Sequence, residues 1–355
     1  MLTITPETRK KLRRFREIKR GYYSFLALLL LMFLFLIGEL LINSRALIVS
    51  YQGELYFPTY GANHPGNDFG LPYTYETNYR DLQAQFRLQG GDNWVLMPPV
   101  PYNANENHSS TGIFRPEPPS AETKHYLGTD STSRDILARL FYGTRTALLF
   151  AVFFTAAVYG IGIAIGAAMG YFGGLFDLLF QRVIEIWSNV PFLYMVIIIF
   201  SVIPSTFSVA ARIMILLVVM VLFSWTGMTY FMRTETYKQK ARDYVASARI
   251  IGAGNARIIF RHVMPNVLAT LVTFIPFTMI SAITAITALD FLGFGLPPPT
   301  PSLGELLKQG TDNLRTAPWI VSAAFGTLVV LLTLVTFVGE AVREASDPKK
   351  FTVYK

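Results

Sequence analysis

The sequence predicts an all-α polytopic membrane protein with six transmembrane helices and a small, loop-rich insertion between the first and the second helix. Charged residues make up only 15% of the 355 residues and apolar residues 52%, whereas soluble domains carry about 25% charged residues. The mean hydropathy is +0.39. Six stretches reach the roughly 20 mostly apolar residues that span a bilayer. They lie at 22–42, 147–170, 183–203, 211–231, 267–289 and 319–339.

The composition excludes several kinds of chemical site. The chain has no cysteine, and its four histidines are too far apart for helical ligand spacing, so we predict no metal site. It contains no Gly-Lys pair and therefore no phosphate-binding loop of the Gly-x-x-x-x-Gly-Lys type. No catalytic constellation is apparent, and we predict no catalytic residues on this chain.

The first apolar stretch, 22–42, follows a basic segment at 1–21 that holds eight Lys and Arg residues. A cleaved signal peptide is the alternative, but its apolar part is usually about 7–15 residues and ends at small residues. Here the apolar stretch is longer and no small-residue site follows it. We therefore expect an uncleaved transmembrane helix.

A long polar insertion occupies 43–146. It contains two Pro-Pro pairs and alternating, strand-compatible pieces at 54–57 and 94–97, but no long helical pattern. We expect 43–125 to form a small domain outside the membrane, followed by an amphipathic segment up to 146. The remaining five spans form a helical core at 147–339, in which Pro191 and Pro276 are expected to kink their helices.

The distribution of basic residues predicts the orientation. Six spans place both termini on one side, and the short segments on that side hold 20 of the 31 Lys and Arg residues. The short segments on the other side hold three, namely Arg212, Lys308 and Arg315. By the positive-inside rule, 1–21, 232–266 and the tail 340–355 are cytoplasmic and the insertion faces outward. The basic surplus thus indicates a lipid bilayer and no nucleic acid.

Ionisable residues near the spans lie close to the predicted helix ends, not at mid-span: Glu39, Glu185, Asp290 and Glu340. Proton relays and ion-coupled carriers place such groups inside the membrane. An ion-coupled secondary carrier or channel therefore stays the weaker alternative. A membrane-anchored enzyme or sensor built on the insertion is weaker still, because the insertion lacks a catalytic cluster.

The cytoplasmic loop 232–266 is the most informative segment. Asp243 is expected to cap a helix at 244–251, with Tyr244, Ala248 and Ile251 on one face. Gly252 suits the left-handed conformation that ends a helix. A second short helix is expected to bury Ile258, Ile259 and Val263 and to stop at Pro265. The physical pattern alone fits insertion into a groove of another protein and attachment to anionic lipid equally well.

This loop resembles the cytoplasmic signature of ABC-importer permeases, Glu-Ala-Ala, three residues, Gly, then Ile and Leu-Pro. Ala246, Ser247 and Ala248 occupy the first three positions, and Gly252 occupies the glycine position. Ile258 and Met264-Pro265 occupy the remaining positions. Ala246 and Ser247 depart from the usual Glu and Ala.

Three further segments resemble the oligopeptide and dipeptide permeases of the OppC/DppC type. They are His125-Tyr-Leu-Gly-Thr-Asp130-Ser-Thr-Ser133-Arg134-Asp135 with Arg139 and Gly143-Thr-Arg145, then Tyr171-Phe-Gly-Gly-Leu-Phe-Asp177, then Asp290-Phe-Leu-Gly-Phe-Gly-Leu-Pro-Pro-Pro-Thr-Pro301-Ser-Leu303-Gly-Glu305. Ser133 stands where those permeases usually have glycine. Asp290 and Leu303 are closer to the YejE branch, which is associated with uptake of peptides and peptide antibiotics such as microcin C.

The resemblance implies the type I ABC importer permease fold and a role in ATP-driven import of oligopeptides or peptide-like compounds. The implied partners are a second permease subunit in a heterodimer, two ATP-binding subunits or one double ATPase, a periplasmic peptide-binding protein and the peptide. ATP and Mg are expected on the ATPases and no cofactor on this chain, which is expected in the bacterial inner membrane with a periplasmic insertion.

The resemblance also assigns candidate site residues. Those expected to couple to the ATPase are Asp243, Tyr244, Ala246, Ser247, Ala248, Gly252, Ile258, His262 and Pro265. Those expected at the periplasmic mouth or along the translocation path are Asp130, Arg134, Asp290, Phe291, Phe294 and Pro301. Asp130 and Arg134 either build a polar turn or contact the binding protein. Asp290 either caps the following turn or meets the amino terminus of a peptide.

Overall fold

The computed structural model describes residues 6–108, 114–204 and 206–347, which are mostly helical with a small three-stranded sheet. The outermost parts of the predicted termini, 1–5 and 348–355, lie outside these residues. The chain divides into two compact units. The helical unit comprises Met1–Leu28, Ala147–Pro298 and Val330–Lys355, and the insertion unit comprises Leu29–Thr146 and Pro299–Val329. The sequence had placed 299–329 in the helical core.

Within the described residues, five helical segments are long and apolar enough to cross a membrane, or up to six if one bent pair is a single span. The five are α2 (Lys19–Leu36), α5 (Ile136–Phe172), α8 (Val209–Lys240), the combined segment Asn255–Leu292 and α14 (Pro318–Ser346). The predicted spans are confirmed as helices, but most extend past the apolar stretch. In particular, α14 continues to Ser346, into the segment predicted as the C-terminal tail.

The third predicted span, 183–203, is not one straight helix. It consists of α6 (Gly174–Ser188) and α7 (Phe192–Val202), which are bent by 73° at a short break. Pro191 directly precedes α7, and its missing N–H and fixed φ explain why the helix is interrupted there. Pro276 lies in the first turn of α12 (Ile275–Leu292), after the 3-10 turn η3 (Val272–Phe274).

Small residues bring α5 and α8 into close contact. A Cβ atom added at Gly166 would lie 2.4 Å from the carbonyl oxygen of Thr229, and one added at Gly170 would lie 2.6 Å from that of Arg233. No larger residue fits at these two positions without a shift of the backbone. Close backbone approach through glycine is typical of helix packing in lipid.

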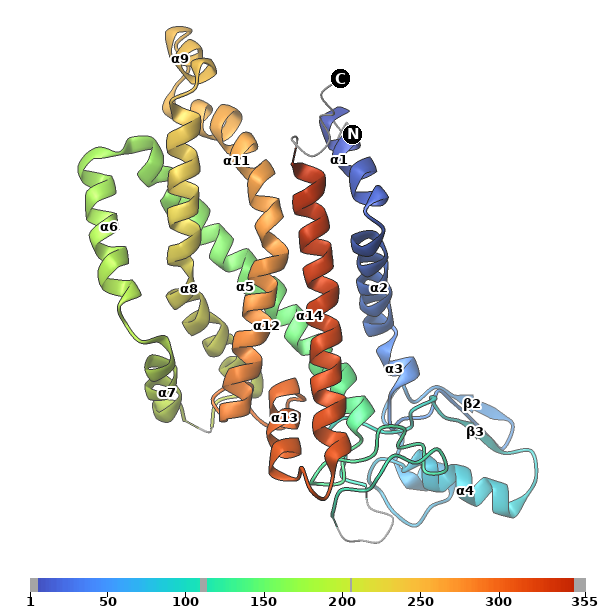
Figure 1. Cartoon of the computed structure of the whole chain (residues 1–355). Helices are drawn as coiled ribbons and strands as arrows, with labels where there is room; N and C mark the ends of the chain where they lie inside the picture. The colour runs from blue at the N-terminus through green and yellow to red at the C-terminus, as the bar shows by residue number, and fades with distance from the viewer. Residues whose placement is uncertain (1–5, 109–113, 205, 348–355) are drawn as a thin grey trace. The chain divides into compact units, whose positions relative to one another are not determined.

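One end of the helical unit gathers several elements (Figure 1). The short helix α9 (Asp243–Ile250) lies beyond the end of α8, and the beginning of α2 and the end of α14 lie at this same end. Arg20 of α2 pairs with Glu340 of α14 at 3.3 Å. The basic helix α1 (Pro6–Glu17) precedes α2.

The insertion unit contains an antiparallel sheet in the order β2-β1-β3. Its strands are β1 (Ile48–Tyr51), β2 (Glu54–Tyr56) and β3 (Trp94–Leu96), so the strand-compatible pieces at 54–57 and 94–97 are confirmed. Val49 of β1 is opposite Tyr56 of β2 and Val95 of β3. The turn between β1 and β2 has positive φ at Gln52 and Gly53, as two-residue hairpin turns require.

A helix that the sequence analysis missed covers this sheet. α4 (Tyr79–Gln89) buries Tyr79, Leu82 and Phe86 against it, and Asn78 caps its N-terminus. The three apolar residues have helical spacing, but the helix is too short and polar to stand out. The other short elements of this unit are α3 (Gly38–Leu41), η1 (Gly66–Phe69) and α13 (Leu303–Asp312).

Candidate functional site

The first candidate region begins at α9. Arg242 precedes the helix with extended backbone torsions, and Asp243 is the first helical residue. Among the described residues, no side chain caps this end, so the predicted cap by Asp243 is wrong. The carboxylate of Asp243 still lies in the first turn, where the helix dipole stabilises a negative charge.

The C-terminal end of α9 agrees with the prediction. Gly252 has a φ of +84°, the left-handed conformation that glycine adopts without steric cost. The N–H of Gly252 donates to the carbonyl of Arg249 at 2.9 Å, and that of Ala253 donates to the carbonyl of Ala248 at 3.0 Å. These two bonds form a Schellman motif, which fixes the end of the helix.

Of the three residues expected on one face of α9, the structure buries only Ala248. The structure buries Val245 and Ala248, whereas Tyr244 and Ile251 lie outside this face. The packing of α9 against α8 and the following turn η2 (Ile258–Val263) sets its rotation. Ile250 and Ile251 are 87% and 85% exposed. Two adjacent large apolar side chains therefore form an accessible surface at the end of α9.

Polar contacts at Tyr171 join the base of α9 to the end of α5. The Tyr171 hydroxyl donates to Asn255 Oδ1 at 2.7 Å, and Lys240 Nζ donates to the Tyr171 carbonyl. The Arg249 guanidinium lies 5.7 Å from the centre of the Tyr171 ring. Contacts from α8, α9 and α10 (Asn255–Arg257) therefore join the base of α9 to the end of α5.

Pro265 does not end a helix, contrary to the prediction. The chain continues from α10 through the π-helical turn η2 into α11 (Met264–Leu271). A π turn accepts an irregular hydrogen-bond pattern near proline: the N–H of Met264 donates to Ile259, five residues back. Ile258 and Val263 are fully buried as expected, and the carbonyl of His262 accepts from Asn266 Nδ2 at 2.9 Å.

An ion pair between the buried Asp177 and the half-buried Arg233 fixes the start of α6 to α8. Asp177 accepts hydrogen bonds from Arg233 Nε at 2.5 Å and from Arg233 Nη2 at 2.7 Å. The Tyr237 hydroxyl also donates to this carboxylate, at 3.0 Å. The Gly-Gly…Asp segment in the sequence was the available signal for Asp177, but Arg233 was not predicted as its partner.

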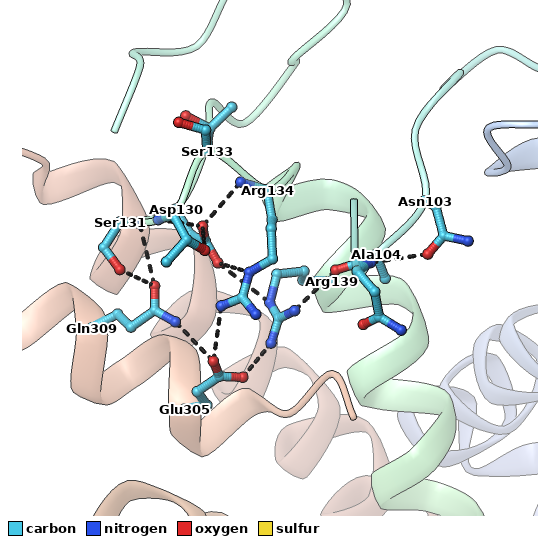
Figure 2. Close-up of polar contacts among 12 residues, drawn as sticks. Asn103, Ala104, Asp130, Ser131, Ser133, Arg134, Arg139, Glu305 and Gln309 are labelled. Atoms are coloured by element: carbon cyan, nitrogen blue, oxygen red, sulfur yellow. Dashed lines mark hydrogen bonds and ion pairs between the residues drawn. The ribbon is translucent and has the colours of Figure 1, made fainter. Parts of the chain in front are cut away.

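The second candidate region lies in the insertion unit, around Asp130 (Figure 2). Asp130 is fully buried. Its Oδ1 accepts from the Thr132 N–H and hydroxyl at 2.9 Å and from the Arg134 N–H at 3.0 Å. Its Oδ2 accepts from Arg134 Nε at 2.7 Å and lies 3.5 Å from Arg139 Nε.

Glu305 completes this group, which we name the ion cluster: Asp130, Arg134, Arg139 and Glu305. Glu305 bonds Arg134 Nη2 at 2.9 Å and also pairs with Arg139 (Figure 2). Gln309 Nε2 donates to Glu305 at 2.9 Å, while Gln309 Oε1 accepts from the Ser131 hydroxyl at 2.8 Å. Two guanidinium groups thus balance two carboxylates, and the cluster joins α13 to the beginning of α5.

The sequence prediction named Asp130 and Arg134 but missed Arg139 and Glu305. The Arg139 side chain is fully buried and donates to the Ala104 carbonyl at 2.9 Å. Burial lowers the pKa of Arg134, but Asp130 and Glu305 outweigh this effect and raise it overall. Burial lowers the pKa of Arg139, an effect that Glu305 and Asp130 offset only in part. The paired charges hold the polar turn together.

Ser133 lies in this turn, at the position where the permeases that the chain resembles usually have glycine. Its φ is +62°, a conformation that disfavours side chains with a Cβ atom. The Ser133 hydroxyl accepts from the Arg115 N–H at 2.8 Å and donates to the Arg115 carbonyl at 2.9 Å. These two bonds offset the strain, which explains how a serine is accommodated at this position.

Asp290 closes the turn after α12. Its Oδ1 accepts from the Leu296 N–H at 2.6 Å, which is the turn-capping contact considered for this residue. Gly293 ends α12 with a φ of +83°, and a Cβ atom at Gly295 would lie only 1.8 Å from Asp290 Oδ1. Phe291 is exposed, whereas Phe294 and, in the insertion unit, Pro301 are half-buried.

A largely apolar cavity of about 560 Å³ lies within the helical unit. None of the predicted path residues lines it. Aromatic residues and small polar residues from α5, α7, α8, α12 and η3 form its wall: Phe154, Val158, Phe192, Met220, Ser224, Gly227, Met228, Phe231, Phe274, Phe277, Thr278, Ser281 and Ala285. No motif in the sequence marked these positions, because an apolar wall looks like any other transmembrane face.

The helical unit contains most of a segment that matches a known protein family. Residues 160–351, more than half of the chain, match the family described as the binding-protein-dependent transport system inner membrane component. The chain belongs to this family. It is a multi-pass inner-membrane protein and a permease subunit of an ABC importer.

Relatives of this permease extend over the whole chain. The peptidoglycan transport system permease protein YejE of Agrobacterium fabrum is 40% identical, covering 98% of this chain and 94% of the relative. The inner membrane ABC transporter permease protein YejE of Escherichia coli is 41% identical, covering 99% of both. The oligopeptide transport system permease protein OppC of Mycobacterium bovis is 33% identical, covering 72% and 84%. The MetNI methionine ABC transporter structure, inward facing, gives a TM-score of 0.44 at 17% identity, covering 59% and 97%.

The family match and the YejE and OppC relatives confirm the resemblance to the OppC type and its YejE branch, as well as the permease fold class. The family match leaves the ion-coupled carrier or channel without support. The ATPase-coupling role of α9 and the path residues stay proposals for this permease. Within the three described ranges, no group of three or more His, Asp or Glu residues is placed to hold a metal ion.

Proposed function

We propose that this permease, paired with a second permease subunit, forms the path by which oligopeptides or peptide-like compounds enter the cell from the periplasm. The names of its relatives support this substrate class, since they refer to oligopeptide and peptidoglycan transport. Fragments of peptidoglycan carry short peptides, so both names share the same chemistry. Uptake of microcin C is a narrower expectation within this class.

The exposed end of α9 supports the proposal that this helix binds the ATPases. A rigid helix with a Schellman end, a buried base and two exposed isoleucines is suited to fit a groove of a partner protein. The partners are two ATP-binding subunits or one double ATPase, which hold ATP and Mg. Closure of the ATPases moves α9, and the contacts at Tyr171 transmit this motion to α5.

In the proposed orientation, α9 and the ends of the chain face the cytoplasm and the insertion unit faces the periplasm. Basic α1, the start of α2 and the end of α14 lie there together with α9, and positive charge favours the cytoplasmic side. The chain has no cysteine, so single cysteines can be introduced without background. A cysteine at Lys11 should react with an impermeant maleimide only in opened cells, and one at Leu88 should react in intact spheroplasts. The reverse pattern contradicts the orientation.

The outer parts have different roles in this proposal. The ion cluster stiffens the mouth on which the peptide-loaded binding protein docks, and Asp290 shapes the turn beside Phe291 and Phe294. The apolar cavity of the helical unit forms part of the peptide path, which is shared with the second permease. Because a ligand shifts a two-state equilibrium only through differential affinity, the loaded binding protein must favour the ATP-bound form.

Reconstitution of the complete importer tests the function. The permease, its second permease, the ATPases and the binding protein are placed in liposomes, and uptake of a radiolabelled tripeptide is measured with and without ATP. We expect uptake that requires both ATP and the binding protein. Uptake driven by a proton or sodium gradient without ATP contradicts the proposal.

A further inference from the structure

A second, polar cavity of about 550 Å³ lies within the insertion unit. None of its lining residues belongs to α9 or to the ion cluster. Charged and polar side chains from α3, α4 and the connecting loops form much of its wall, among them Glu39, Arg45, Glu76, Tyr79, Arg80 and Glu106. Its volume is within the range of about 300–1,000 Å³ that small-molecule sites occupy.

The charges of the wall leave one carboxylate weakly paired. Arg80 forms two bonds to Glu106 and a third to the Pro101 carbonyl. Arg45 pairs with Glu76 at 2.6 Å. The ion-pair partner of Glu39, Arg145, is 3.9 Å away, and the Glu39 side chain is 43% exposed. The lining residues thus hold three carboxylates and two guanidinium groups, while the third guanidinium, that of Arg145, lies outside the lining. Glu39 has the longest ion-pair distance of the three carboxylates, so it is the one most available to a ligand with a positive charge.

Tyr79 provides an independent indication of a ligand. Its side chain is 1% exposed, and its buried hydroxyl has no hydrogen-bond partner among the described residues. Burial, and then the charge of Glu76, raises the pKa of Tyr79 to about 12, so the hydroxyl stays protonated. A buried donor without an acceptor is unfavourable, and a ligand that supplies an acceptor removes this penalty.

We propose that the polar cavity binds the amino-terminal end of a short peptide. Glu39 pairs with the free ammonium group, and the Tyr79 hydroxyl donates to a peptide carbonyl. This site rests on the proposed function, because it takes the same class of substrate. It gives the permease itself a contact with peptide outside the transmembrane path.

Calorimetry on the full-length chain in lipid nanodiscs tests the site with three probes. Ala-Ala-Ala carries the free ammonium group, acetyl-Ala-Ala-Ala lacks it, and acetyl-Ala-Lys-Ala carries a cationic side chain only. We expect saturable binding of Ala-Ala-Ala and at least tenfold weaker binding of both acetylated peptides. Equal binding of acetyl-Ala-Lys-Ala overturns the assignment, since the cavity then takes a basic side chain of a partner. Absence of saturable binding up to about 10 mM, near −2.7 kcal/mol, also overturns it.

Matched variants locate the binding. Tyr79→Phe removes only the hydroxyl and should weaken Ala-Ala-Ala binding about tenfold, while Tyr75→Phe, an exposed tyrosine outside the cavity, leaves it unchanged. Glu39→Gln should weaken it similarly, with Glu122→Gln as the control outside the wall. Tyr79→Phe should melt at or above the temperature of the unmodified chain, because a buried unpaired donor is lost. Unchanged binding in both cavity variants overturns the proposal.

The two proposals fail separately. Binding on the permease alone requires no ATP, no ATPase and no binding protein. ATP-dependent tripeptide uptake without binding to the isolated chain contradicts the cavity site only. Binding without ATP-dependent uptake contradicts the transport function only.

Discussion

α9 and the ion cluster both lie in segments that resemble family motifs, yet they differ in burial. α9 ends in Ile250 and Ile251, which are exposed and apolar. The ion cluster buries Asp130 and Arg139 completely and pairs every charge internally. On the basis of this difference in burial, we interpret the end of α9 as the partner surface proposed above and the ion cluster as a support for the fold.

The largest effect on stability is expected in the ion cluster. Arg139→Ala leaves Asp130 and Glu305 with one guanidinium, and breaking a buried pair costs about 3–5 kcal/mol. We expect a large loss of folded chain and a lower melting temperature in detergent. Arg87→Ala, an exposed arginine on α4, is the control. Equal melting temperatures of the two variants would show that the cluster does not support the fold.

A smaller loss is expected at Ser133. Ser133→Ala keeps the strained φ of +62° and removes both bonds to Arg115, so we expect a destabilisation of about 1–3 kcal/mol. Ser133→Gly removes the same bonds but relieves the backbone strain, and it should be the more stable of the two variants. Thermal unfolding of both measures the difference, and the opposite order contradicts our account of the turn.

The smallest effect on stability is expected at Gly252. A Cβ atom there meets nothing within 4 Å, so Gly252→Ala costs only the left-handed conformation, about 1 kcal/mol. Gly254→Ala is the matched control, because Gly254 has a φ of −68° and is equally open. Gly252→Ala should speed amide hydrogen exchange in α9 and lower peptide-stimulated ATPase activity. If both variants behave alike, the helix end has no special role in coupling.

Much of the fold was predictable from composition and hydropathy. Apolar stretches predicted every span, and alternating residues predicted β2 and β3. Proline alone does not predict where a helix ends: Pro191 lies at the break between α6 and α7, whereas the helical chain continues through Pro265. Tertiary packing decides between these two outcomes. α4 was missed because an 11-residue helix with a narrow apolar face has little hydropathy signal.

The candidate site was predictable only in part. Gly252 and Asp130 could be predicted as candidate site residues, because both belong to short motifs with characteristic spacing. Arg139, Glu305 and Arg233 were missed as partners, since long-range pairing is not visible in one sequence. The buried face of α9 could not be predicted either, because eight residues span only about two turns and the contacts at the base of the helix decide which residues are buried.

The central claim is that the end of α9 binds the ATPase. The direct measurement is copurification of the ATPase subunits with the double variant Ile250→Asp, Ile251→Asp. Leu88→Asp is the control, because Leu88 is 88% exposed on α4, in the other unit. We predict that the double variant loses the ATPases at an unchanged melting temperature, while the control retains them. Full retention of the ATPases by the double variant would contradict the account.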